Sequence, residues 1–228
     1  MRMLDSGVDR VPVSRPGFLA RLVTALLRLI VPVAALCATL AAAFLLREVP
    51  VAEARYLASL DPRLDAAEWM TWGLVVLPAV FFILNITSRR YGPALTLTAA
   101  FVAWLLIGGA LILVLYEGLI VDFSEEVVPY PEAAAFAGAM ALAQLVNILT
   151  FDWLRGIPWW KAPFLAALMG GIAFVVTFSM RPTAPWDSAL IARLIVEAGL
   201  YFSWALLQLV PTGMLRRTIR PLSGFGGA

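Results

Sequence analysis

Histidine is absent from this chain of 228 residues, and cysteine occurs once, as Cys37 within an apolar run. Zinc sites, Ser-His-Asp triads and Cys-His pairs all need these residue types, so the sequence excludes them. Haem held through histidine is excluded for the same reason. We therefore predict no catalytic residue, no metal and no cofactor, and we expect that the protein is not an enzyme. Cys37 is expected to be a small buried side chain.

Charged residues are also scarce. They make up 14% of the chain, whereas hydrophobic residues make up 62%. Soluble domains contain roughly 45–50% apolar and about 25% charged residues, so this composition indicates a polytopic membrane protein. The formal net charge of +2 does not point to nucleic acid, because the basic residues lie between the apolar runs. The expected partners are membrane lipid and a small molecule, without nucleic acid; a second copy of the chain or a partner in a membrane complex stays open.

Six apolar runs are long enough to cross a bilayer as helices. They cover about residues 29–46, 69–88, 93–116, 133–151, 162–180 and 188–215. At 1.5 Å per residue, a helix of about 18 residues spans about 27 Å, close to the thickness of a hydrocarbon core. None of the runs alternates in polarity as barrel strands do. We predict an all-α integral membrane fold with six transmembrane helices, preceded by residues 1–28 and followed by a tail of residues 216–228.

The distribution of basic residues predicts the orientation. Of the 17 Lys and Arg residues, 12 lie in the first segment, in the turns at Arg89-Arg90 and Arg155–Lys161, and in the tail. Only four lie in the connections on the other side of the membrane. Because cytoplasmic loops carry an excess of Lys and Arg, both termini are expected in the cytoplasm. The predicted location is the bacterial cytoplasmic (inner) membrane.

A short hairpin between the fourth and fifth runs carries the sequence Trp159-Trp160-Lys161. Indole rings favour the headgroup level of a bilayer, and a neighbouring Lys favours its cytoplasmic side. We therefore predict that these three residues anchor the hairpin in the membrane interface.

Polar side chains within the runs are the candidates for function, because such groups are costly in a bilayer. Gln144 and Asn147 are three residues apart, so they share one face of a helix, and Arg193 and Glu197 are spaced to form an ion pair. The predicted substrate-binding set is Asn85, Gln144, Asn147, Glu197 and Tyr201. The alternative is structural: the amides would hydrogen-bond between helices, and Arg193 would extend to the surface and neutralise Glu197.

Small and hydroxyl residues predict contacts between helices. Gly108-Gly109 and Gly170-Gly171 are expected to let helices pack closely. An alanine stripe in the first run either packs against a neighbouring helix or docks another subunit; it consists of Ala34, Ala38 and Ala42. Four hydroxyl side chains are expected to bond back to carbonyls of their own helices: Thr39, Thr96, Thr98 and Ser179.

Residues 70–215 resemble the queuosine-precursor transporters, also called the vitamin uptake transporter family. The resemblance rests on the stretch PAVFFILNITSRRYG, on Ala143-Gln144 and on the hairpin; the hairpin positions are Phe151, Leu154-Arg155, Trp159-Trp160 and Ala162-Pro163, followed by Gly170. The resemblance implies a six-helix inner-membrane protein that takes up 7-cyano-7-deazaguanine and related deazapurines.

The chain departs from the family pattern at its acidic positions. Asn85 and Asn147 stand where the family has Asp, while the fifth-helix polar set is replaced by Gly171, Ala173 and Phe174. Glu197 matches the family's acid, but the following Lys becomes Tyr201. The functional hypothesis is a carrier for such a planar molecule or for an altered neutral substrate. The alternatives are an accessory or assembly subunit of a larger membrane complex, and a substrate-binding component that docks an energising module.

Overall fold

The computed structural model describes residues 17–62, 65–67, 69–115, 130–156, 158–179 and 188–221. The described part is built of helices, with one isolated β-bridge between Pro50 and Thr71 and no strand. Its α-helices are α1 (Phe18–Leu45), α2 (Trp72–Val76), α3 (Ala79–Tyr91), α4 (Pro93–Leu115), α5 (Tyr130–Trp153), α6 (Lys161–Phe174), α7 (Ser188–Leu207) and α8 (Leu209–Leu215). A 3-10 helix, η1 (Ala52–Ser59), precedes α2, and a π-helical turn, η3 (Val175–Ser179), follows α6.

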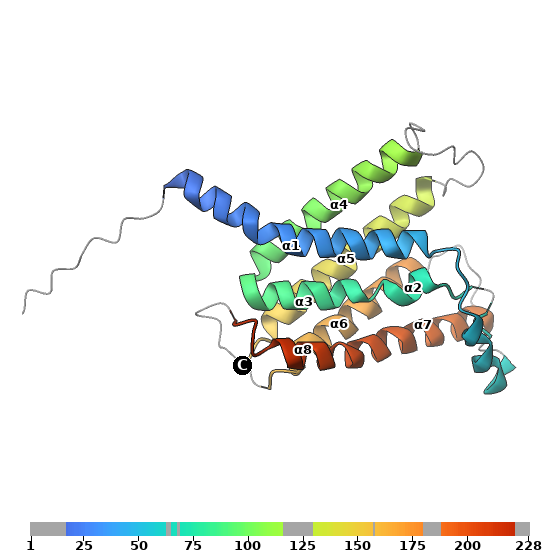
Figure 1. The fold of residues 1–228 in the computed structure, drawn as a ribbon. Helices are drawn as coiled ribbons and strands as arrows, with labels where there is room; N and C mark the ends of the chain where they lie inside the picture. The colour runs from blue at the N-terminus through green and yellow to red at the C-terminus, as the bar shows by residue number, and fades with distance from the viewer. Residues whose placement is uncertain are drawn as a thin grey trace, which may run out of the picture.

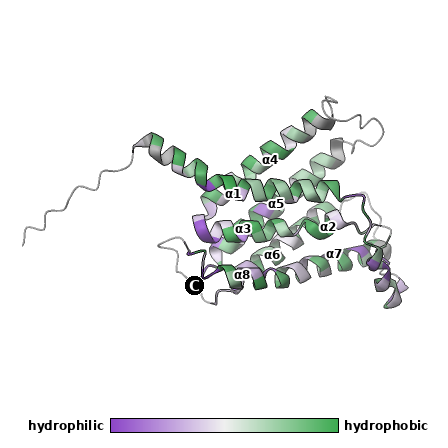
Figure 2. Cartoon of the chain, in the orientation of Figure 1, coloured by the Kyte–Doolittle hydropathy of each residue, from purple (hydrophilic) through white to green (hydrophobic). Residues whose placement is uncertain are grey.

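Six spans in the described part are long and apolar enough to cross a membrane, which confirms the predicted fold class. They are Val23–Leu45, Trp72–Tyr91, Pro93–Ala110, Ala133–Trp153, Lys161–Ser179 and Leu190–Leu215. Hydrophobic residues run along the helices, while hydrophilic residues gather mainly at the ends of the bundle (Figure 2). The chain is therefore a multi-pass membrane protein. The end that holds Arg89, Arg155 and Arg216 is called the basic end below; its cytoplasmic location stays a prediction.

Three of the spans are interrupted helices. Pro78 has no backbone N–H, and after it the N–H groups of Val80 and Phe81 bond only three residues back, to Leu77 and Pro78. This break separates α2 from α3, and the Trp204 indole N–H donates to the Val75 carbonyl beside it, at 2.7 Å. The fifth span widens into η3, and the last span breaks between α7 and α8.

Helix α6 lies at the centre of the bundle, against α3, α5, α7 and α8 (Figure 1). Gly170 and Gly171 make this possible. A Cβ at Gly170 would lie 3.0 Å from Asn147 Cβ, and one at Gly171 would lie 2.7 Å from Tyr201 Cβ. The predicted close packing at this pair is confirmed. The prediction for Gly108-Gly109 is wrong within the described part of the chain, because a Cβ at either position of α4 would have no described neighbour within 4 Å.

Helix α1 packs against α2, α3 and α4. It begins at Phe18, well before residue 29, and its N-terminal part projects beyond the bundle (Figure 1). Cys37 is half-buried, with its sulfur 3.9 Å from the Ala103 carbonyl oxygen of α4. Ala34 and Ala38 are exposed and Ala42 is half-buried, so for Ala34 and Ala38 the first of the two alternatives, packing against a neighbouring helix, is not met by the described helices of this chain.

The segment between α1 and α2 packs against Val196 and Leu200 of α7. Val51 and Met70 are joined by a backbone hydrogen bond of 2.9 Å, and both belong to a small apolar cluster. Val196 and Leu200 of α7 pack against this cluster. The chain's own residues therefore cover this part of α7.

Candidate functional site

Asn147 is the most unusual polar side chain in the bundle. It lies on α5, 0% exposed, and neither its amide nitrogen nor its amide oxygen has a hydrogen-bond partner among the described residues. Its Cβ lies against Gly170, and Phe81 approaches the same glycine. A buried unpaired amide costs about 1–3 kcal/mol, so side chains in this condition need an explanation.

Tyr201 is buried on α7 beside this position. Its ring packs over Gly171 and lies 6.1 Å from the ring of Phe81 and 5.8 Å from that of Phe174, between ring centroids. Its hydroxyl has no partner in the described part of the chain. A buried tyrosine hydroxyl usually finds one. The aromatic ring is thus packed on three sides, while its buried hydroxyl has no partner among the described residues.

Asn85 lies one helical turn after Phe81 on α3 and shares a polar cluster with two other helices. Its amide nitrogen donates to the carbonyl oxygen of Pro163 and to Oε1 of Gln208, both at 3.1 Å. The amide nitrogen of Gln208 donates to the same Pro163 oxygen at 2.9 Å. The amide oxygen of Asn85 has no partner among the described residues.

These side chains gather around one face of α6. Gly170 contacts Asn147 and Gly171 contacts Tyr201. Two turns earlier on the same helix, the Pro163 carbonyl accepts a hydrogen bond from Asn85. On these three side chains, four buried polar atoms have no partner among the described residues: Asn85 Oδ1, Asn147 Nδ2, Asn147 Oδ1 and Tyr201 Oη; Thr212 Oγ1 on α8 is in the same condition. None of the three side chains is charged. Their amide and hydroxyl groups supply hydrogen-bond donors and acceptors, and the rings of Phe81 and Tyr201 offer apolar contact.

Gln144 does not join this cluster, although it shares a helix with Asn147. Its Oε1 accepts a hydrogen bond of 2.9 Å from the indole N–H of Trp104 on α4. Gln144 is buried at the contact between α4 and α5. The structure therefore separates the two amides that the sequence placed on one face, and Gln144 has the interhelical role that the structural alternative assigned to both.

Glu197 is occupied by other groups. Arg193 donates to one carboxylate oxygen at 2.9 Å, and the hydroxyl of Ser179 donates to the other. The guanidinium of Arg193 also lies 5.1 Å from the centre of the Trp69 ring, in the segment that covers α7. Ser179 ends the π-helical turn η3, so this turn delivers the hydroxyl to the acid. The expectation that Ser179 bonds back to its own helix is wrong, whereas the expectation for Thr39, Thr96 and Thr98 is confirmed.

The predicted membrane anchors at the basic end differ from one another. Trp160 is exposed and contacts Phe164, as an interfacial ring would. Trp159 packs onto Gly213 of α8, and the guanidinium of Arg216 lies 5.0 Å from the centre of its ring. Trp159 thus joins the hairpin to α8. Lys161 begins α6 and is exposed.

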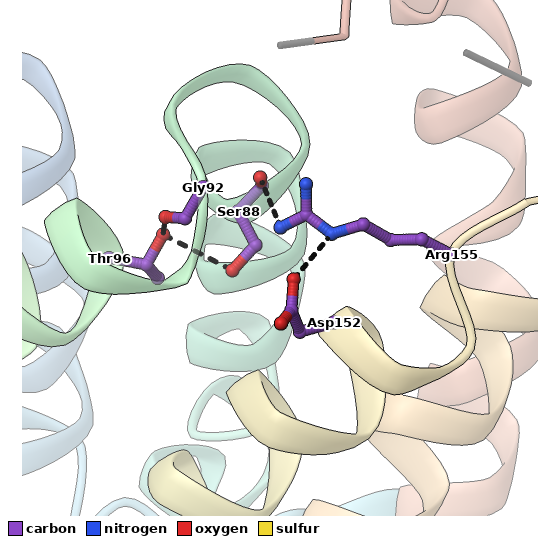
Figure 3. A network of polar contacts seen from close by, with 5 residues as sticks. All are labelled: Ser88, Gly92, Thr96, Asp152 and Arg155. Carbon is purple, nitrogen blue, oxygen red and sulfur yellow. Dashed lines mark hydrogen bonds and ion pairs between the residues drawn. The ribbon is translucent and has the colours of Figure 1, made fainter. Parts of the chain in front are cut away.

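Arg155 joins the same hairpin to α3 (Figure 3). Its Nη2 donates to the Ser88 carbonyl and its Nε pairs with Asp152, both at 2.9 Å. The Ser88 hydroxyl continues the network to Thr96, which in turn donates to the Gly92 carbonyl. Burial lowers the pKa of Arg155, and the carboxylate of Asp152 opposes this shift. The guanidinium of Arg155 therefore links the hairpin between α5 and α6 to the C-terminal end of α3.

No protein-family model, curated protein or solved structure matches this chain. The site therefore has to be argued from its own residues. Sequence reasoning missed Gln208 and Pro163 as members of the polar cluster. The spacing of seven residues from Tyr201 places Gln208 on the same face of the last span, and this was the available signal. No sequence signal marks the Pro163 carbonyl as an acceptor for two side chains.

Proposed function

We propose that this protein is a carrier, in the bacterial inner membrane, for a small, neutral, planar molecule with a hydrogen-bonding edge. The observation that supports it is the group of unpaired buried atoms on Asn85, Asn147 and Tyr201. Such atoms are costly in a membrane-embedded bundle, and a ligand that pairs with them recovers that cost on binding. Asn147 offers a donor beside an acceptor, which complements an amide-like N–H and C=O edge.

The resemblance to queuosine-precursor transporters supports a purine-like substrate, such as 7-cyano-7-deazaguanine or an altered neutral relative. Asn85 and Asn147 replace two acids of the family pattern, which favours a ligand without positive charge. The remaining buried acid, Glu197, is held by Arg193 and Ser179. We therefore place the substrate on the two asparagines and Tyr201, without direct contact to Glu197.

The test is thermal unfolding of the purified protein in detergent with guanine, 7-cyano-7-deazaguanine and pterin. Binding adds RT ln(1 + [L]/Kd) to the stability, about 2.7 kcal/mol at a hundredfold excess over Kd. We expect a shift for the wild type with at least one ligand. Asn147→Leu and Tyr201→Phe should abolish this shift, because each removes unpaired polar atoms.

Gln144→Leu is the matched control on the same helix. It removes the partner of Trp104, so it should lower the stability of the free protein while the ligand shift remains. Asn147→Leu should instead leave the free protein as stable or more stable, because the lost amide had no partner. Loss of the ligand shift in Gln144→Leu together with its retention in Asn147→Leu would reject the proposed site.

A second candidate is an accessory or assembly subunit of a larger membrane complex. The exposed Ala34 and Ala38 of α1 favour it, because small residues on a lipid-facing surface let another helix approach closely. On this function no ligand would shift the unfolding of the wild type. A membrane partner would co-purify in fixed ratio, and Ala34→Phe would release it.

A further inference from the structure

Gln208 occupies a special position in the last span. It lies between α7 and α8, ahead of Pro211, which lacks the N–H that would continue the helix. Its side chain is 2% exposed and meets α3 and α6 together. Among the described residues, only Gln208 hydrogen-bonds through its side chain to both Asn85 and the Pro163 carbonyl.

The Pro163 carbonyl determines the orientation of both amides. A carbonyl oxygen only accepts hydrogen bonds, so the amide atoms that face it on Asn85 and Gln208 must be nitrogens. The oxygen of Gln208 then faces the Asn85 nitrogen and accepts its second hydrogen. A reversed amide at either residue would bring two acceptors together. The three groups thus form a closed triangle with one arrangement.

This triangle uses both hydrogens of the Asn85 amide and leaves only its oxygen, Oδ1, unpaired. We propose that Gln208 is a positioning residue that holds Asn85 as an acceptor, so that the carrier selects ligands that present an N–H donor to it. This inference rests on the carrier function proposed above. Gln208 acts through Asn85, with no contact of its own to the ligand.

The consequence is a defined discrimination between closely related molecules. A ligand that lacks the donor leaves Asn85 Oδ1 buried and unpaired, which is the arrangement that a polar site rejects most strongly. With Gln208 removed, the amide keeps one hydrogen bond to Pro163, and its oxygen is no longer fixed. The loss of binding affinity caused by a missing N–H donor on the ligand should then become smaller.

The experiment measures dissociation constants of the full-length protein in detergent for guanine, 1-methylguanine, 9-methylguanine and hypoxanthine. Each of the last three lacks one N–H or N–H₂ donor of guanine. In the wild type, one of them should bind at least about tenfold more weakly than guanine. Asn85→Leu should remove that difference, which identifies the donor that Asn85 accepts. Gln208→Met, which has similar length and no amide, should reduce the difference to less than about threefold.

Two further variants control for misfolding of Gln208→Met and for the general effect of removing a polar side chain. Gln208→Leu also removes the amide N–H₂ and C=O groups, with a shorter side chain, so it should reduce the same ratio even if the Met variant fails to fold. Thr98→Val alters a hydroxyl that bonds to the Ala94 carbonyl of its own helix on α4, outside this triangle, and should keep the wild-type ratio. Gln208→Met should also have no further effect on the ratio in the Asn85→Leu background.

The outcomes separate the two proposals. If Asn85→Leu removes the discrimination while Gln208→Met and Gln208→Leu retain it at the wild-type value, the positioning role is wrong and the carrier function stands. If no purine binds the wild type at all, both the carrier function and the role of Gln208 are overturned.

Discussion

Gly171 lets the aromatic ring of Tyr201 lie directly on the backbone of α6. We predict that Gly171→Ala lowers the free energy of unfolding by about 1–3 kcal/mol, because the added Cβ would lie 2.7 Å from Tyr201 Cβ and Cγ and would force the helices apart. The measurement is thermal unfolding in detergent. Ligand binding should weaken in the same variant, because the hydroxyl of Tyr201 moves with its ring.

Gly108→Ala is the control for this prediction. Gly108 also lies within an apolar helix, but a Cβ there would have no neighbour within 4 Å. Alanine favours a helix over glycine by about 1 kcal/mol, so this variant should be as stable as the wild type or more stable. Equal destabilisation by the two substitutions would show that the close contact at Gly171 is not what limits this position.

The two glycine pairs also show what a sequence can predict at this scale. Thr39, Thr96 and Thr98 behave as expected, because each hydroxyl bonds to a carbonyl four residues earlier in the chain, which for Thr96 is that of Gly92 immediately before α4. A glycine pair behaves differently, since its packing depends on which helix lies beside it. Gly108-Gly109 and Gly170-Gly171 are both glycine pairs within apolar helices, but only the second pair has close neighbours among the described residues. The neighbour that decides between them comes from a distant part of the chain.

At the scale of the elements, the break between α2 and α3 is held by a side chain of α7. The Trp204 indole donates to the Val75 carbonyl, beside the Leu77-Pro78 interruption. We predict that Trp204→Phe costs about 1 kcal/mol of stability, because a carbonyl at the break loses a donor. In a Pro78→Ala background, where the helix can close across the break, the same substitution should cost less.

A double-mutant cycle on thermal or denaturant unfolding measures this difference. Coupling between contacting sites is typically about 0.5–3 kcal/mol, whereas independent sites add within about 0.5 kcal/mol. Trp153→Phe is a suitable control, because that ring is 83% exposed at the end of α5. Additive effects of Trp204→Phe and Pro78→Ala would mean that the indole does not stabilise the interrupted helix.

The six spans were predictable because length and hydropathy are enough to identify a membrane helix. The interruptions were harder. Pro78 and Pro211 mark two of them in the sequence, since proline removes a backbone donor. The π-helical turn η3 contains the ordinary sequence VVTFS, and no residue in it signals the change. Its effect is nevertheless large, because it turns Ser179 toward Glu197 instead of toward its own helix.

At the scale of the whole molecule, the polar cluster depends on α6, because Gly170 and Gly171 have no side chains and let α5 and α7 pack closely against it. Helical spacing predicted which polar residues share a face, but it could not say which helix would lie opposite. Asn85, Asn147 and Tyr201 come together around α6, whereas Gln144 faces α4 and Glu197 is held by Arg193. The membership of the site was therefore predictable only in part, since it depends on how the helices are arranged around one another.

The orientation of the whole bundle leads to the last prediction. Arg89, Arg155 and Arg216 place the basic end on the cytoplasmic side under the positive-inside rule, and the η1 segment then faces the outside. Cys37 is the only cysteine, so Cys37→Ala gives a background in which single cysteines can be introduced. Tyr56 of η1 and Lys161 at the start of α6 are both exposed and lie at opposite ends.

In intact bacterial cells, a membrane-impermeant maleimide should label Tyr56→Cys and leave Lys161→Cys unmodified. After the membrane is permeabilised, both should react, which controls for accessibility of the thiol. The physical reason is that moving the basic end outward would require the Arg and Lys groups around it to cross the bilayer during insertion, at a cost of about 2.5–3.5 kcal/mol for a charge at its centre. The opposite labelling pattern would show that the topology is the reverse of the predicted one. It would also place the Trp159 and Arg155 hairpin on the outer surface, so that Asn85 and Gln208 would lie nearer the outer side of the membrane.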